Sequence, residues 1–524
     1  MFKHLFPLIL FALPFTLFGE ELPREVPRPA IEGYRHITTP PYIAKPEGIT
    51  GNYYKVVVSP KMLPDPLLRY RVNIFATEQE TGNAYPLHLA ALKEFNMKFQ
   101  QSQESYFRSE AFRKHDPESK EERKEIERLR FKFFPLYYHW GNSMSTEITA
   151  DEEARFYLGL QNVYALMEKA SKKTYFDWSD EYEFKGIATL LPVLHEARAL
   201  ARYLAGKANW EIRNGNYDDA IRTLRVGLAY ADHILESKPS GFLVGMMVGV
   251  AIKSTMWEQL IFLSAQPDAP NLYPALMQLM VNQKVLHNTI QSETHFLVRQ
   301  YNDDEFWASL DNLSPEESKS ILDGFIALFA DSGVVETKKA MSLFQTYMSL
   351  IAYQPAKQRL LQKGLSEQEI EALTTYQIIV PFALEEIKRT YDLMVVDASM
   401  PIGESRSAIS GFDEHVVRLT QNPTNGPAGM MLALLAPATQ AARTAFHRQQ
   451  QTLNLLKIIH AIRYYAAVHD GKLPASLDEI TELAVPKMCP ITGKMYEYRV
   501  VDNMAIIDYS MYSPDKSRIE IVVE

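Results

Sequence analysis

The spacing of apolar residues changes along this chain, and the change constrains the fold more than any motif does. From residue 86 to about residue 396, apolar side chains recur at spacings of three and four, which is typical of helices that bury one face. From Tyr496 the spacing becomes two, as in Tyr498 and Val500, which is typical of strands with one buried face. The sequence therefore predicts a mainly α protein, a multi-helix body followed by a small α+β unit.

Composition divides the chain further. Nine prolines lie between residues 20 and 66, where no helical period is present. A second stretch rich in proline and glycine separates the helical body from the last hundred residues. We predict five segments: a signal peptide (1–19), a proline-rich N-terminal arm in which 53–59 and 70–75 suit short strands (20–84), a helical body (85–398), a linker (399–428) and a C-terminal unit (429–524).

The first residues have the pattern of a secretory signal. Lys3 and His4 precede the apolar run Leu5–Phe18, which is shorter than the roughly 20 residues that a membrane helix needs. We therefore expect cleavage after the small residue Gly19, export to the periplasm or the medium, and no transmembrane segment after removal of the signal. The single cysteine, Cys489, allows no internal disulfide.

Two apolar stripes in the body, at 194–208 and 217–231, flank the turn Asn214-Gly-Asn216. This pattern predicts two short helices that pack antiparallel. The stretch Gly215–Ile221 and the small residue Ala208 resemble the tetratricopeptide repeat, the helical hairpin that stacks into binding solenoids. One such hairpin is evident and no second copy follows at the repeat period. The next apolar segment, Gly241–Ala251, is predicted to be a buried core helix in which glycines spaced by four allow close packing.

Near the C-terminus, the apolar residues from 429 to 462 predict one long helix, with Pro437 as the place where it could bend. The loop Asp470–Glu479 and the turn Cys489–Lys494 follow, and then three strands that we expect to form an antiparallel meander over the helix. This order resembles the helix and sheet of a pilin or pseudopilin. Together with the loop Ala269-Pro-Asn-Leu-Tyr273, it resembles an uncharacterised family of exported helical proteins from planctomycete-type bacteria. The resemblance implies a place in the cell envelope and names no activity.

The sequence offers no catalytic, cofactor-binding or metal-ligating residue. His195 and Glu196 lack the second histidine of a zinc-peptidase motif, and Glu293 and His295 lie on different faces of a helix. The acidic run 303–305 lacks the spacing of a calcium loop, and Ser513 with Lys516 falls in a turn. His460 and His469 are predicted to pack beneath the sheet. Cys489 is predicted to be a structural thiol whose replacement has only the effect of a surface substitution.

The net charge of −9, with acids and bases mixed along the chain, disfavours nucleic acid as a partner. Two functional hypotheses stay open. The first is a non-enzymatic exported scaffold or protein-interaction module with protein partners in the cell envelope, favoured because a repeat-like hairpin is present and catalytic motifs are not. The second is an enzyme, a hydrolase of an envelope polymer, whose paired carboxylates would meet only in the fold.

Overall fold

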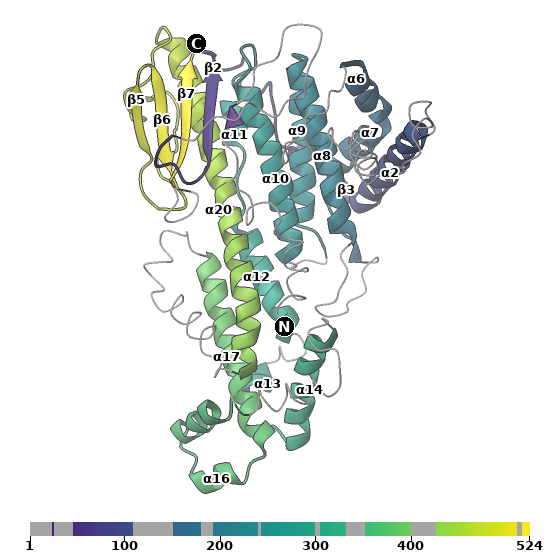
Figure 1. The fold of residues 1–524 in the computed structure, drawn as a ribbon, viewed down its shortest axis with the longest axis vertical. Helices are drawn as coiled ribbons and strands as arrows, with labels where there is room; N and C mark the ends of the chain where they lie inside the picture. Colours follow the sequence, from purple (N-terminus) through teal and green to yellow (C-terminus); the bar gives the residue numbers. More distant parts are fainter. Residues whose placement is uncertain are drawn as a thin grey trace, which may run out of the picture.

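A computed structural model of the chain describes residues 24–25, 46–107, 150–179, 192–238, 243–298, 304–331, 350, 352–399, 426–510 and 516–524. The molecule is elongated (Figure 1), with a sheet and a helical bundle at one end and a smaller group of helices at the other. One long helix, α20 (Gly426–Val468), runs through both ends. The mainly α class predicted from the apolar period is confirmed.

In the part of the chain that the structure describes, six helices of the larger bundle pack side by side. Their bounds are α2 (Tyr85–Phe107), α6 (Ala150–Gly159), α7 (Gln161–Ser171), α8 (Pro192–Arg213), α9 (Tyr217–Leu235) and α10 (Leu243–Ser264). The tight turn between α8 and α9 is possible because Gly215 adopts a φ of 75°, a left-handed conformation that costs glycine little. A short parallel sheet of β3 (Glu80–Asn83) and β4 (Lys173–Tyr175) lies beside α2.

Helix α10 is apolar around its whole circumference, as the sequence predicts for a core helix. Among the described residues it is the one helix long and apolar enough to cross a membrane, and 72% of its most apolar window is buried within the protein. A Cβ added at Gly249 would lie 2.6 Å from Leu235 of α9, and one added at Gly227 would lie 2.3 Å from Met256 of α10. The two glycines therefore allow α9 and α10 to approach closely from both sides.

The smaller group of helices has its own apolar core. Its elements are α12 (Gln283–Val298), α13 (Asp304–Ala308), η5 (Leu310–Asn312), α14 (Pro315–Asp331), α16 (Glu367–Glu371) and α17 (Thr375–Ser399). Leu286 of α12 and Leu384 of α17 pack there against Phe446 of α20. The short α11 (Tyr273–Met277) lies higher, beside α20. The predicted linker lies almost wholly outside the described residues, as does the predicted signal peptide.

The sheet joins the two ends of the chain. Its strand order is β1-β2-β7-β6-β5, with β1 (Arg24–Glu25), β2 (Tyr53–Val58), β5 (Glu497–Val501), β6 (Met504–Tyr509) and β7 (Ser517–Val523). The last three strands are antiparallel neighbours, whereas β2 pairs with β7 in parallel, with Val56 opposite Ile521. The sequence pattern places 53–59 in an N-terminal arm, but in the structure β2 is a strand of the C-terminal sheet. Residues 70–75, which suit a strand by composition, form none and precede the short helix η1 (Ala76–Glu78).

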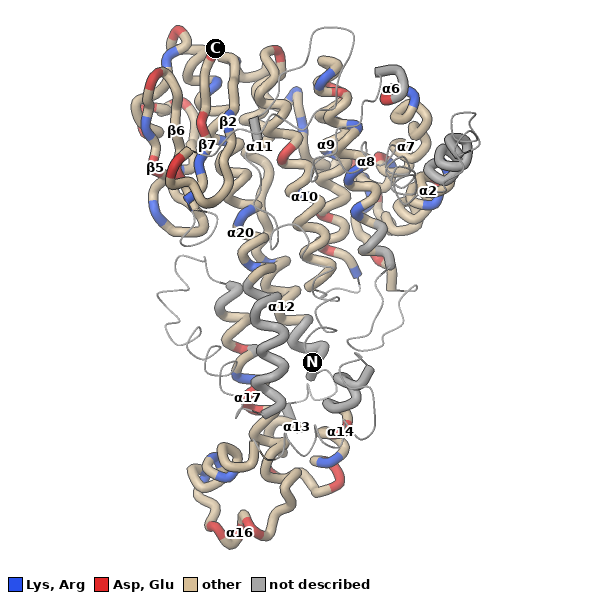
Figure 2. The backbone as a smooth tube through the Cα atoms, in the orientation of Figure 1, with Lys and Arg blue, Asp and Glu red and all other residues tan. Residues whose placement is uncertain are grey.

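Alternation along these strands sets the face that packs on α20. Ile507, Ile519 and Ile521 are buried in the same core as Ile458 and Ile462 of α20. Tyr498, at the edge strand β5, is only half-buried. Acidic and basic residues are interspersed over the described chain (Figure 2), in keeping with the mixed charge of the sequence.

Candidate functional site

A polar junction lies in the core where α20 meets the loop after α10 and the residues that follow β2. Arg463 of α20 is fully buried, and its guanidinium donates to three backbone carbonyl oxygens: Ser59 at 3.0 Å, Ala269 at 2.8 Å and Pro270 at 3.4 Å. Burial lowers the pKa of Arg463 to about 10, an effect that the Tyr217 hydroxyl opposes. The side chain therefore stays a cation at neutral pH, and its charge is balanced by carbonyl dipoles.

Asn271 completes this junction with a single amide group. Its Nδ2 donates to the carbonyl oxygens of Lys61 at 3.0 Å and His460 at 2.9 Å, while its Oδ1 accepts the backbone N–H of Tyr273. The N–H of Lys61 in turn donates to the carbonyl oxygen of Arg463. Segments that are about two hundred and four hundred residues apart are therefore fixed to one another by backbone hydrogen bonds to a few buried side chains.

His460 and Ser264 form the contact in this junction that most resembles a catalytic pair. The His460 Nε2 lies 2.9 Å from the Ser264 Oγ, and both residues are fully buried. The His460 Nδ1 accepts the backbone N–H of Leu272, so the ring proton is assigned to Nε2, and His460 donates to the serine. The serine hydroxyl donates onward to the Leu260 carbonyl oxygen at 2.7 Å.

A nucleophilic serine needs the opposite arrangement, in which the hydroxyl donates to a histidine that acts as base. Here the proton of Ser264 is held by a helix carbonyl, and His460 has no free lone pair to accept it. Burial holds the pKa of His460 well below its usual range, and the charge of Arg463 adds to that effect. The ring is therefore neutral, and both of its nitrogens serve the packing of α20.

Cys489 differs from the sequence prediction. The thiol is only 3% exposed, and its Sγ donates to the Gln451 Oε1 at 3.2 Å. The same oxygen accepts from the Tyr496 hydroxyl at 3.3 Å. The turn is closed by backbone hydrogen bonds from Cys489 to Lys494 and from Gly493 to Cys489, and it folds the thiol inward against α20. Replacing Cys489 is therefore a core substitution, and the prediction of a surface effect is corrected.

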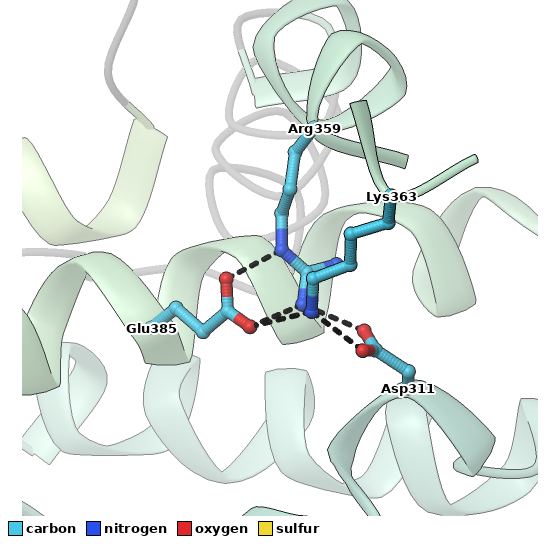
Figure 3. Close-up of polar contacts among 4 residues, drawn as sticks. All are labelled: Asp311, Arg359, Lys363 and Glu385. Atoms are coloured by element: carbon cyan, nitrogen blue, oxygen red, sulfur yellow. Dashed lines mark hydrogen bonds and ion pairs between the residues drawn. The ribbon is translucent and has the colours of Figure 1, made fainter. Parts of the chain in front are cut away.

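A second polar cluster lies in the smaller group of helices (Figure 3). Arg359 donates to Asp311 of η5 at 2.6 Å and to both carboxylate oxygens of Glu385 of α17, and Lys363 bonds the same two acids at 2.6 and 3.0 Å. Partial burial raises the pKa of Asp311 and of Glu385, but the hydrogen bonds from the two cations outweigh it and lower both. Two cations and two anions cancel, so the cluster joins three segments without net charge.

The remaining residues weighed from the sequence are spread apart. His469 is half-buried, and its ring stacks on Tyr465 with centroids 3.9 Å apart. The structure does not describe the side chains of the other candidates, which are His195, Glu196, Glu293, His295, residues 303–305 and Ser513. Within the part of the chain that the structure describes, no three His, Cys, Asp or Glu side chains gather as a metal site requires.

Sequence reasoning missed Arg463, Asn271 and Ser264. A signal was present, because Arg463 follows directly after an apolar run in a helix predicted to be buried, where a charge needs partners. For the loop that contains Asn271, the sequence offers only the family resemblance and no sign of a buried hydrogen-bonding role. Comparison of the chain with protein-family models, with curated proteins and with solved structures finds no match.

Proposed function

We propose that this protein is a non-enzymatic exported scaffold, or protein-interaction module, of the cell envelope. The observation that carries the proposal is the polarity of the Ser264–His460 hydrogen bond, in which histidine donates and serine passes its proton to a carbonyl. Arg463 and Cys489 likewise donate to oxygen atoms of the protein, the Ala269 carbonyl and the Gln451 side chain. Within the described chain, the polar atoms of these serine, histidine, arginine and cysteine side chains therefore serve to join segments of the fold.

The arrangement of helices supports the repeat-like and pilin-like parts of this proposal. Helices α8 and α9 have 22 and 19 residues, are joined by the turn at Gly215, and bury the small residues Ala208 and Ala220 where they meet. The C-terminal half of α20 lies against the inner face of the sheet, the arrangement expected of a pilin-like end. The additional strand β2 departs from that pattern and makes the N-terminal residues part of the sheet.

Apolar side chains at one end of the molecule support the expectation of protein partners. Strands β2 and β5 both run parallel to β7, so they end at the same edge of the sheet. The end of α20 lies at that edge too, because Arg463 bonds residues just after β2. Exposed apolar residues lie at or after the ends of these three elements: Met62, Leu67 and Leu68 after β2, Val468 at the end of α20, and Val500 and Val501 at the end of β5. Exposed apolar groups of this kind are typical of surfaces that bind partners.

The competing hydrolase hypothesis makes the sharpest test. The mature chain, starting at Glu20, is incubated with purified peptidoglycan and with other envelope polysaccharides, and the release of reducing ends is measured. We expect no release above that of buffer, and no difference between the wild type and Ser264→Ala. Turnover by the wild type above that of buffer would contradict the proposal, and its loss in Ser264→Ala with unchanged circular dichroism would assign it to Ser264.

Partner binding and location are tested in the source cells. A photo-crosslinking amino acid at Leu67 should join a discrete envelope protein, whereas the same probe at the exposed Lys494, on the turn before β5, should not. N-terminal sequencing of the envelope fraction should start at Glu20. Recovery of an intact Met1 would contradict export by signal cleavage.

A further inference from the structure

Two histidines meet in the core of the larger bundle, away from the junction. His88 of α2 is fully buried, with its Nδ1 3.2 Å from the Met167 Sδ of α7 and its Nε2 3.2 Å from the Nδ1 of His233 of α9. The other nitrogen of His233, Nε2, lies 2.9 Å from the backbone carbonyl oxygen of Lys173 in β4. A chain of three contacts therefore connects α7, α2, α9 and β4 through two imidazole rings.

The number of protons on the two rings decides which of these contacts are made. A carbonyl oxygen only accepts, so the His233 Nε2 carries a proton, and its Nδ1 is then the acceptor for the His88 Nε2–H. This is the neutral pair, with one proton on each ring. It satisfies the carbonyl and the contact between the rings, and of the two unprotonated nitrogens only the His88 Nδ1 faces another acceptor, the Met167 sulfur.

Acid adds protons to this pair in a defined order. A first additional proton has a place on the His88 Nδ1, where it donates to the Met167 sulfur. A second has only the His233 Nδ1 left, which faces the His88 Nε2–H across 3.2 Å. Two N–H donors and two positive charges would then oppose each other in a buried site, which is unfavourable by both hydrogen bonding and electrostatics.

The surroundings provide little to offset that charge. The rings of Phe176 and Tyr230 lie 5.5 and 4.5 Å from the His88 ring, measured between centroids. Asp232 of α9, whose charge acts on His233, is half-exposed and already paired with Lys253 of α10. On β4 the ammonium group of Lys173 is paired with Glu80 of β3.

Those groups agree with the direction of the pKa shifts. Burial lowers the pKa of His88, and the neighbouring His233 lowers it further. For His233 burial also lowers the pKa, although the Lys173 carbonyl and Asp232 oppose it. Both rings are therefore neutral at neutral pH, which is the state that satisfies the contact between them.

We propose that the His88–His233 pair is an acid-sensitive lock that holds α2, α7 and the β3–β4 sheet against α9. The same interface contains a tie that does not titrate, the reciprocal backbone bonds between the residues after β4 and Lys238 after α9: the Lys238 N–H donates to the Phe176 carbonyl oxygen at 2.8 Å, and the Trp178 N–H donates to the Lys238 carbonyl oxygen at 2.9 Å. Uptake of two protons removes the histidine tie and leaves this one. The group formed by α2, α7 and the small sheet then separates locally from the bundle while α8, α9 and α10 stay packed.

Hydrogen exchange in the full mature chain tests the lock. Protection of α2 and β4 is followed by mass spectrometry from about pH 7.5 to about pH 4.5, which brackets the ordinary histidine pKa of about 6.5, with correction for intrinsic rates. Because opening takes up two protons, its equilibrium constant should rise by up to about a hundredfold per pH unit in acid. Exchange of the imidazole C2 hydrogens, measured on the same samples, reports the protonation of each histidine.

Two variants assign the effect. His233→Gln removes one titrating ring, so the limiting slope should fall to about tenfold per pH unit. His469→Gln, a histidine outside the pair, should keep the slope of the wild type. Protection of α2 that does not change with pH, or protonation of both His88 and His233 without loss of that protection, would overturn the proposal. That second outcome is read from the unmodified chain and does not depend on the folding of any variant.

Discussion

The junction at Arg463 and the cluster at Arg359 use the same side chain under opposite conditions. Arg463 is fully buried, and within the described part of the chain its hydrogen-bond acceptors are all carbonyl oxygens. Arg359 bonds two carboxylates that are 40 to 41% exposed, beside a second cation (Figure 3). Both arginines join segments that are distant along the chain.

The difference concerns what is left behind when the arginine is removed. At the junction, loss of Arg463 removes the donor from three carbonyl oxygens, those of Ala269 and Pro270 buried and that of Ser59 partly buried, and leaves a cavity in the core. At the cluster, loss of Arg359 leaves two acids that water and Lys363 can still reach. Loss of a hydrogen bond lowers the free energy of unfolding most when water cannot reach the partners left behind, whereas exposed ion pairs contribute little to it. The following predictions test this contrast in order of expected effect.

Arg463→Ala should destabilise the protein by about 3–5 kcal/mol, because it combines unsatisfied buried acceptors with a cavity. Urea unfolding monitored by circular dichroism measures the change. Arg222→Ala, at an exposed arginine of α9 paired with Asp219, is the control and should cost less than about 0.5 kcal/mol. Equal effects of the two substitutions would remove the contrast.

Asn271→Ala should cost about 2 kcal/mol, because the Asn271 amide no longer donates to the carbonyl oxygens of Lys61 and His460 and no longer accepts the N–H of Tyr273. The loss should be accompanied by faster hydrogen exchange of residues 59–63, which the amide holds against α20. Asn312→Ala, at an exposed asparagine of η5, serves as the control. Unchanged exchange at 59–63 would show that this amide does not hold the segment.

The stability contributed by His460 should depend on pH. Its folded pKa lies below the unfolded value of about 6.5, so the contribution is complete above that pH and is lost as the pH falls below it. The slope expected from this one residue is up to about 1.4 kcal/mol per pH unit. Urea titrations at several pH values should therefore show a shallower slope for His460→Gln than for the wild type, and parallel slopes would refute the assignment.

Cys489→Ser should cost about 1 kcal/mol, since it places a shorter, more polar hydroxyl in a buried position beside Gln451. Thermal unfolding of the two proteins measures the difference. Ser179→Ala, at an exposed serine, gives the scale of a surface change. A difference no larger than that of Ser179→Ala would restore the prediction made from the sequence.

Arg359→Gln should cost about 1 kcal/mol or less, and the cost should shrink in high salt because the cluster is partly exposed. Repeating the unfolding at low and high ionic strength separates this effect from that of Arg463→Ala. The effect of Arg463→Ala should be nearly independent of salt. A salt-independent cost at Arg359 would place the cluster in the same class as the junction.

The helices and the last three strands were predictable because the spacing of apolar and turn-forming residues within each segment indicates its structure. The turn at Gly215 and the start of α2 at Tyr85 are examples, since period and breaker residues lie within a few positions of the feature they define. The candidate junction was not predictable in this way. Its acceptors are backbone carbonyls, and every residue carries one, so residue types do not indicate which carbonyls accept from Arg463.

By itself, then, the sequence determined the mainly α class, the helical hairpin at Gly215 and the alternating strands near the end, all of which follow from the spacing of apolar residues. The tertiary structure alone decided that β2 completes the C-terminal sheet, that Cys489 is buried and that His460 donates to Ser264. The physical reason is the distance along the chain between the groups that interact. Periodicity records which face of one element leaves water, whereas strand partners and hydrogen-bond directions depend on groups hundreds of residues away that only the fold brings within 3 Å or so.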